Sequence, residues 1–397
     1  MSLGVASTPI RPVEEPVPPR AQTLLLFDPL LLLAALGLVG CSLVTLHVAT
    51  RGSRPGPSYY VERQGIYAAL GLAVALVLSR LDYSRLRRYK LGFFGAMILL
   101  NLVVLGMPAV NGSRRWITLP LFQFQSSEFG KVLLILALSS FAVDRARRLH
   151  ELRTTIRIML LALLPALIVM PQPDLGTALV YIVVGFTMLF VAGTPWKQLA
   201  GLTAVALAAV AIVLAGPSLG VHVLKPYQQQ RLTGFLNPSH DPRNQTYNVT
   251  ESLIAIGSGQ KTGRGVAGAT QTELNFLPAP STDFVFAALG ETYGFVGAAL
   301  VLSLYALLIW RALRIVMLAK NLYGTLIAGG ILAMLMFQVF VNVGMTIGIM
   351  PITGVPLPLM SYGGSSVVVT FIAIGLLQSI HVQARVVSTS KSRALVS

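Results

Sequence analysis

Long apolar runs separated by short polar stretches dominate this chain of 397 residues. They lie at about 24–48, 64–80, 91–110, 128–143, 156–171, 175–194, 198–216, 284–310, 322–349 and 362–383. An apolar helix of about 20 residues crosses the hydrocarbon core of a bilayer. The pattern therefore predicts an all-α polytopic membrane protein with about ten transmembrane helices.

The pattern changes between the seventh and eighth runs, where a long polar segment occupies about 217–283. Loops of this length are usually functional or disordered. This loop contains aromatic residues and an apolar turn at 253–256, so we expect it to fold in part on the membrane face. Residues 1–22 are proline-rich and lack an apolar run, which predicts a disordered tail. We expect one transmembrane domain at 23–385 and a second tail at 386–397.

Composition and charge agree with a membrane location. The chain is 54% hydrophobic and 11% charged, with a formal net charge of +16. Such a charge could indicate a nucleic-acid partner, but most of the basic residues fall in loops on the side that would hold both termini. The positive-inside rule therefore predicts cytoplasmic termini, an extracytoplasmic 217–283 loop and no nucleic-acid partner. The single cysteine, Cys41, excludes a disulfide framework, and five histidines without paired spacing argue against a metal cage.

Ionisable residues in or beside the apolar runs are candidates for function, because charge within a bilayer is costly. Glu128 and Lys131 lie three residues apart, so they share one helix face and can neutralise each other. The pair is either a structural ion pair, or Lys131 faces a cavity and binds an anionic head group. Asp174 follows Pro171, Gln172 and Pro173, which predicts a helix N-cap.

Asp283 ends the long loop where the eighth apolar run begins, at the membrane surface. It is either another helix cap or a weak base held within reach of a substrate hydroxyl. Glu291 lies two helical turns deeper on about the same face. It is either a second member of the site or a buried, partnered acid, and we favour the second interpretation.

Three further segments could contact an anionic substrate. The glycine cluster at 257–265, which contains Lys261, fits neither phosphate-loop template and predicts a flexible basic turn. Arg115 and Trp116 lie in an outer loop, where they could form part of the interfacial belt or hold a lipid phosphate. The connection at 342–366 is rich in helix breakers, and non-helical backbone at membrane depth must be buried or line a wet cavity. We therefore expect it to border the working site.

Several motifs, in order, resemble the SEDS family (shape, elongation, division and sporulation) of bacterial peptidoglycan glycosyltransferases. They are Arg115 and Trp116, then residues 125–131, 172–177, 227–231, 255–259, 282–284, 290–291 and 356–366. The resemblance covers about 24–385, and residues 344–358 resemble the elongation branch (RodA type) more than the division branch (FtsW type). Ser126 replaces a family proline, which should alter only the helix start. Ala279 and Ser281 replace a family Glu and His, so the chemistry depends on Asp283.

The resemblance implies polymerisation of lipid II into β-1,4 glycan strands on the outer face of the bacterial cytoplasmic membrane during cell elongation, with release of undecaprenyl pyrophosphate. Asp283 would be the catalytic base. The implied pyrophosphate-binding candidates are Arg115, Lys131, Arg231 and Lys261. The supporting residues would be Glu128, Trp116, Asp174, Glu291, Ser361 and Ser365. No cofactor is certain, although a divalent cation (Mg²⁺ or Mn²⁺) could assist the leaving group.

The implied partners are lipid II, a class B penicillin-binding transpeptidase and other proteins of the elongation machinery. One alternative of a different class is a lipid II flippase, since ten spans with intramembrane charge suit a transporter. Others are the division paralogue of the same polymerase and a scaffold for a penicillin-binding protein. An acid at the membrane surface beside a long folded loop favours a surface enzyme over a transporter.

Overall fold

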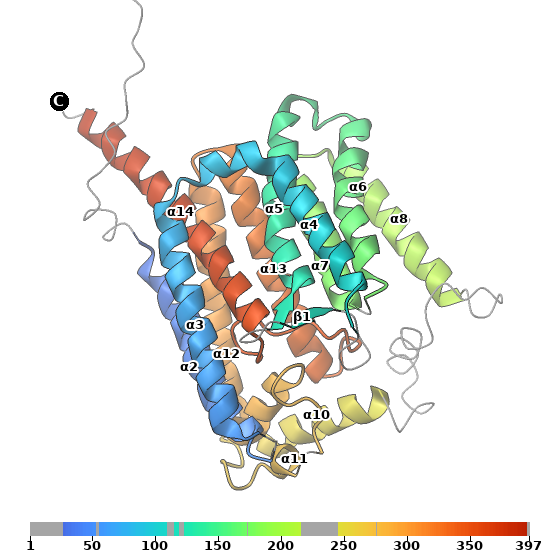
Figure 1. Cartoon of the computed structure of the whole chain (residues 1–397), viewed down its shortest axis with the longest axis vertical. Helices are drawn as coiled ribbons and strands as arrows, with labels where there is room; N and C mark the ends of the chain where they lie inside the picture. Colours follow the sequence, from blue (N-terminus) through green and yellow to red (C-terminus); the bar gives the residue numbers. More distant parts are fainter. Residues whose placement is uncertain are drawn as a thin grey trace, which may run out of the picture.

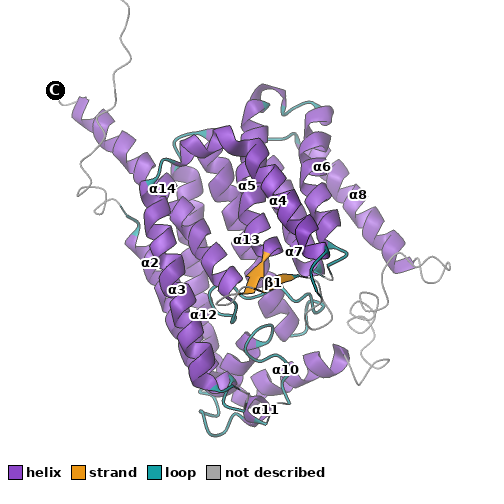
Figure 2. Cartoon of the chain, viewed as in Figure 1, coloured by secondary structure: helices purple, strands orange, loops and turns teal. Residues whose placement is uncertain are grey.

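A bundle of membrane helices makes up most of the protein (Figures 1 and 2). The computed structural model describes residues 27–52, 55–108, 115–118, 123–172, 174–215, 245–274 and 276–394. Within these residues, nine helices are long and apolar enough to cross a membrane, and α7 is a shorter apolar helix. The prediction of an all-α polytopic membrane protein with about ten spans is confirmed.

The apolar helices follow the predicted order. They are α2 (Pro29–Ala49), α3 (Pro57–Arg80), α4 (Lys90–Leu105), α5 (Ser126–Asp144), α6 (Leu152–Val169), α7 (Leu175–Val191), α8 (Trp196–Ala215), α12 (Val285–Leu318), α13 (Leu322–Thr346) and α14 (Gly364–Ala394). The shorter elements are η2 (Tyr83–Tyr89), η3 (Ala146–Arg148), β1 (Trp116–Thr118), β2 (Gln123–Gln125), α10 (Gln245–Gly259) and α11 (Thr270–Glu273). Local signals explain several helix starts: Pro29 and Pro57 occupy first-turn positions, and the side chains of Asp28 and Asn321 cap α2 and α13.

The centre of the bundle is formed by α5, α13 and α14, whose most apolar windows are 78%, 72% and 94% buried. By contrast, α8 is 6% buried and lies at the edge (Figure 1). Small residues allow the helices to approach closely. Close packing is needed in a membrane because lipid tails offer apolar side chains an equally favourable surrounding. A Cβ added to Gly375 of α14 would lie 2.7 Å from the Cα of Ala75 in α3.

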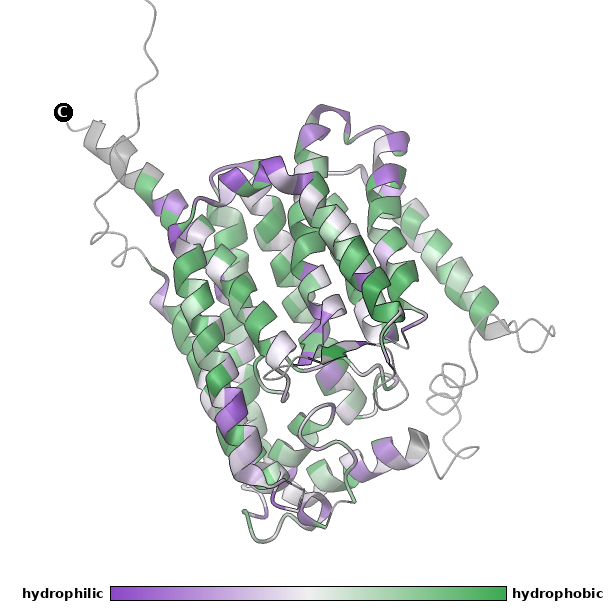
Figure 3. Ribbon diagram, in the orientation of Figure 1, coloured by the Kyte–Doolittle hydropathy of each residue, from purple (hydrophilic) through white to green (hydrophobic). Residues whose placement is uncertain are grey.

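The two ends of the bundle differ in character (Figure 3). Hydrophilic residues gather at the end that carries η2, η3 and the start of α2. At the opposite end, α10 and α11 lie against the bundle (Figure 1). This confirms that the long loop is partly folded, over its described residues 245–274. Its position opposite the basic loops agrees with the predicted arrangement, while the side that faces the cytoplasm stays a prediction.

Several helices differ from their predicted limits, and two of them run well past the predicted C-terminal end. Helix α12 runs to Leu318 and contains a kink at Gly294, with φ 61° and ψ −156°. No proline marks this kink, so the sequence pattern did not reveal it. Helix α14 continues to Ala394, past the predicted span end at 383 and into the predicted tail at 386–397. No Gly or Pro interrupts the sequence between 383 and 394, so nothing local ends the helix.

The segment 257–265 ends α10 and contains a turn with exposed Lys261 and Arg264, as predicted, but the prediction that this turn is flexible is wrong. Its backbone forms hydrogen bonds with residues of α12 on both sides of the kink at Gly294. Arg264 N–H donates to Glu291 O (2.9 Å), and the N–H groups of Phe295 and Val296 donate to the carbonyls of Gln260 (2.9 Å) and Lys261 (3.1 Å). The turn therefore satisfies backbone groups that the kink removes from the helix ladder. Glycine is needed for this approach, since a Cβ at Gly263 (φ +85°) would lie 2.1 Å from Thr292 O.

Candidate active site

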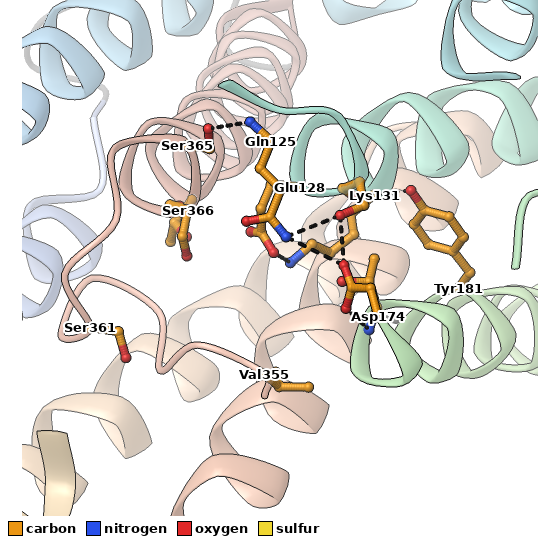
Figure 4. Close-up of polar contacts among 12 residues, drawn as sticks. Gln125, Glu128, Lys131, Asp174, Tyr181, Val355, Ser361, Ser365 and Ser366 are labelled. Carbon is orange, nitrogen blue, oxygen red and sulfur yellow. Dashed lines mark hydrogen bonds and ion pairs between the residues drawn. The ribbon is translucent and has the colours of Figure 1, made fainter. Parts of the chain in front are cut away.

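A buried ion pair lies near the start of α5 (Figure 4). Lys131 Nζ is 2.5 Å from Glu128 Oε1, and the two side chains are 1% and 2% exposed. The predicted mutual neutralisation is confirmed. In this conformation Lys131 does not face open solvent, so its charge is held in place by Glu128. Removal of either partner alone would leave an uncompensated buried charge.

Asp174 joins α7 to α5. Its Oδ1 accepts from Thr177 N–H (3.1 Å), which confirms the predicted N-cap. Its Oδ2 accepts from Ser127 Oγ (2.8 Å) and from Gln125 Nε2 (3.3 Å). Asp174 is 2% exposed, so this carboxylate fixes the helix start that carries Glu128 and Lys131 (Figure 4). We call residues 125–131 together with Asp174 the ion-pair cluster.

The hairpin β1–β2 places Arg115 and Trp116 beside Gln125, the first residue of the ion-pair cluster. Trp116 pairs with Gln125 across the hairpin, and the Arg115 guanidinium lies 5.5 Å from the Trp116 ring centre. Ser365 of α14 clamps β2, because its Oγ donates to Gln123 O and accepts from Gln125 N–H, both at 2.9 Å. The hairpin escaped prediction because each strand has only three residues, too few to show an alternating pattern.

The breaker-rich connection at 351–363, which we call the strap, holds the loop that ends in Asp283. Ser361 Oγ donates to Thr282 O (2.6 Å), and Tyr362 N–H donates to Ser281 O (2.8 Å). Asn342 Nδ2 donates to Asp283 O (3.1 Å) and to Val355 O (2.8 Å). The strap therefore packs against the loop that ends in Asp283, while its position at the working site stays a prediction.

Asp283 itself is half-buried on a tight turn before α12. The N-cap of α12 is Phe284, which makes no side-chain cap hydrogen bond. Asp283 therefore lies one residue before the N-cap position of α12. The turn is fixed by Ala279, whose φ is +44° and whose carbonyl accepts from the N–H groups of Thr282 (3.1 Å) and Phe284 (3.3 Å).

Glu291 is a buried, partnered acid. It is 0% exposed. Its carboxylate accepts from Gln271 N–H (2.8 Å), Thr272 N–H (2.9 Å) and Thr272 Oγ (2.6 Å). These bonds fasten α11 to α12, which supports the interpretation that we favoured.

Among the other predicted residues, Arg231 lies outside the described part of the chain. Lys261 is exposed on the glycine-rich turn, where its carbonyl bonds α12. The strap connects the two groups of predicted residues: a Cβ added to Gly176, two residues after Asp174, would lie 2.3 Å from Val355 Cγ2. The ion-pair cluster and the Asp283 loop are therefore two parts of one structural unit.

Several residues of this unit were not predicted. Gln64 Nε2 donates to Ser361 O (3.1 Å), and Gln172 Nε2 donates to Asn101 O (2.8 Å). Asn101 and Gln64 lie inside apolar runs, where an isolated amide could have been noticed. Their partners are distant in sequence and could not have been identified.

A further unpredicted group is aromatic. The Tyr362 ring meets the Tyr60 ring edge-on at 4.9 Å, and the Arg63 guanidinium lies 4.4 Å above the Tyr59 ring centre. Burial raises the pKa of Tyr362 to about 12, so its hydroxyl stays protonated at neutral pH. This aromatic group lies beside the strap because Tyr362 belongs to it.

The fold and the site define a class: a polytopic membrane protein with a buried ion pair, and an acid at the end of a partly folded loop at one face. The chain belongs to the family described as cell cycle protein, the FtsW, RodA and SpoVE family, which matches residues 23–386.

Curated relatives and solved structures agree. The chain is 36% identical to the peptidoglycan glycosyltransferase RodA of Treponema pallidum, covering 89% of this chain and 97% of that one. It is also 36% identical to the peptidoglycan glycosyltransferase MrdB of Escherichia coli K12, covering 91% and 95%. A chain from a peptidoglycan synthase complex matches with a TM-score of 0.75 and 33% identity, covering 90% and 98%. Rod shape determining protein RodA of Thermus thermophilus matches with a TM-score of 0.65 and 31% identity, covering 89% and 96%.

Proposed function

We propose that this chain is a peptidoglycan glycosyltransferase that polymerises lipid II into β-1,4 glycan strands during cell elongation. The relatives named as such glycosyltransferases support the reaction class. The observation that carries the proposal is the position of Asp283 at the end of the bundle where the long loop folds. Asn342 donates a hydrogen bond to the backbone carbonyl of Asp283, and Ser361 donates one to the carbonyl of the preceding residue, Thr282. A lipid-linked sugar would emerge from the bilayer at this depth.

The proposed chemistry is a single displacement at the anomeric carbon of the growing strand's MurNAc residue. The 4-hydroxyl of an incoming GlcNAc attacks, the bond to the pyrophosphate oxygen breaks, and the α configuration becomes β. The acceptor hydroxyl must lose its proton as the new bond forms, and Asp283 is assigned to accept that proton. A carboxylate on a rigid turn suits this role because the base must stay within hydrogen-bond reach of the hydroxyl.

The leaving pyrophosphate carries the developing negative charge and needs cationic partners. We assign the first contact to Arg115, which the hairpin places beside the ion-pair cluster, with Lys131, Arg231 and Lys261 as further candidates. The ion pair with Glu128 holds the Lys131 ammonium group in a fixed position, from which we expect it to supply positive charge near the leaving group. Among the described residues, no group of three or more His, Cys, Asp or Glu side chains could hold a metal ion. Mg²⁺ or Mn²⁺ would then depend mainly on substrate phosphates for ligands.

The proposal includes location and partner. We place both termini in the cytoplasm and residues 245–274 outside the cytoplasmic membrane, because the basic loops lie at the end opposite α10 and α11. A single transmembrane domain at 23–385 is consistent with the continuous bundle. The matching chain from a peptidoglycan synthase complex that coordinates polymerization and crosslinking supports a class B penicillin-binding transpeptidase as partner.

The test uses purified protein and lipid II, with and without that partner. In detergent, the polymerase should convert lipid II to glycan strands. In liposomes, a flippase would instead move lipid II across the bilayer and make no glycan. Lipid II movement without polymer, under conditions where a related polymerase is active, would reject the proposed function in favour of the flippase.

A further inference from the structure

A group of basic side chains surrounds a cavity at the end of the bundle opposite α10 and α11. The helix η2 leads directly into α4, and Arg85, Arg87 and Arg88 of η2 are exposed. A cavity of about 430 Å³ is lined by Ser84, Arg85, Arg87, Arg88, Lys90 and Asp144. Four cations face one carboxylate in this η2 cavity, so its lining carries net positive charge.

The backbone that presents these cations is fixed. Tyr83 is 1% exposed, and its hydroxyl donates to Asn321 Oδ1 (3.3 Å). Ser84 N–H donates to Asp82 Oδ1 (2.9 Å), and Ser379 Oγ donates to Leu81 O (2.6 Å). An anion that binds here would meet arginines on a rigid segment, which lowers the entropy cost of binding.

Asp144 balances only part of the positive charge. It forms salt bridges to Arg87 Nη2 (2.7 Å) and to Lys90 Nζ. Within the described part of the chain, Arg85 and Arg88 form no salt bridge. Guanidinium groups pair in a bidentate manner with phosphate oxygens, so these two arginines suit a phosphate ligand.

The surroundings of the cavity are apolar and exposed. Tyr89, the last residue of η2, is 51% exposed, and Leu91, in the first turn of α4, is 70% exposed. Leu99 and Leu102, further along α4, are also exposed, at 62% and 48%. Figure 3 shows hydrophilic residues at this end of the bundle above the hydrophobic length of α4. A cationic cavity next to an apolar helix face matches an amphiphile with a phosphate head and acyl chains.

We propose that the η2 cavity binds the phosphate head group of an anionic phospholipid, whose acyl chains lie along the exposed face of α4. Basic pockets at helix ends bind such head groups in other membrane proteins, and each cation near the surface contributes a comparable share of the attraction. This site is separate from the ion-pair cluster and the Asp283 loop, and the proposal does not depend on the glycosyltransferase assignment.

The test measures lipid binding to the full chain in detergent by native mass spectrometry. The protein is titrated with phosphatidylglycerol or with phosphatidylcholine. The wild type should bind phosphatidylglycerol about tenfold more tightly, and the double variant Arg85→Gln/Arg88→Gln should lose this preference. The matched control is Arg153→Gln/Arg157→Gln, which removes the same charge from exposed positions on α6 at the same end of the bundle, and it should keep the preference.

A second variant tests the proposal through an expected increase in lipid affinity. Asp144→Asn removes the carboxylate that holds Arg87 and Lys90, so phosphatidylglycerol should bind more tightly than to the wild type. A folding defect cannot produce that result. Inorganic phosphate serves as the competing arm, and it should not displace the lipid at equal concentration. Equal binding of the two lipids, equal losses in the two double variants, weaker binding by Asp144→Asn or displacement by equimolar phosphate would each overturn the proposal.

Discussion

The buried ion pair offers a quantitative test of how the site is built. Lys131→Met leaves Glu128 without its partner at a position where both side chains are at most 2% exposed. Breaking a buried pair in this way costs about 3–5 kcal/mol of folding free energy, while replacing both charges by neutral groups is often nearly neutral. The double variant Glu128→Gln/Lys131→Met should therefore recover most of the stability that either single variant loses.

The same set of single and double variants also distinguishes a structural role of the ion pair from a role of Lys131 in substrate binding. We expect the double variant to be stable and yet to polymerise lipid II at least about tenfold more slowly, because Lys131 no longer supplies charge near the leaving group. Stability is followed by thermal unfolding in detergent and activity by glycan strand formation. The exposed pair of Arg87 and Asp144 is the control, since breaking it should cost about 1 kcal/mol or less. A stable double variant with wild-type activity would refute a substrate role for Lys131, and additive losses would refute the coupling.

Three further predictions concern the framework. Gly263→Ala should lower the thermal stability by much more than Gly265→Ala, because both positions have positive φ but only the Cβ at 263 would meet a backbone oxygen, at 2.1 Å; equal shifts in melting temperature would contradict this. Asn342→Leu should cost about 1–3 kcal/mol by removing the amide that donates to the carbonyls of Asp283 and Val355, and it should lower the polymerisation rate; an unchanged rate would separate this amide from catalysis. The pKa of Tyr362 is raised from 10.0 to about 12 in the folded protein, so its contribution to stability is complete below pH 10 and is lost as the pH rises towards 12. Tyr362→Phe should remove that part of the stability loss at alkaline pH, measured as the free energy of unfolding against pH. A variant whose stability falls between pH 10 and pH 12 as steeply as that of the wild type would contradict the raised pKa of Tyr362.

What the sequence could predict was local. The spans follow from apolar length, the Glu128 and Lys131 pair from a spacing of three on one helix, and the Asp174 cap from the breakers before it. The contacts of Asn342 with Asp283 and of Gln64 with Ser361 join residues from different helices, and no local pattern specifies such partners. The kink at Gly294 escaped prediction for the same reason, because a turn about thirty residues earlier supplies the hydrogen bonds that stabilise it.

The role of Asp283 as base is tested most directly by the initial rate of glycan strand formation by Asp283→Asn with lipid II in detergent. This change keeps the size of the side chain and removes its ability to accept the hydroxyl proton. The proposed mechanism predicts a loss of about a hundredfold or more, with a thermal stability close to that of the wild type. A well-folded Asp283→Asn variant that makes polymer at the wild-type rate would contradict it.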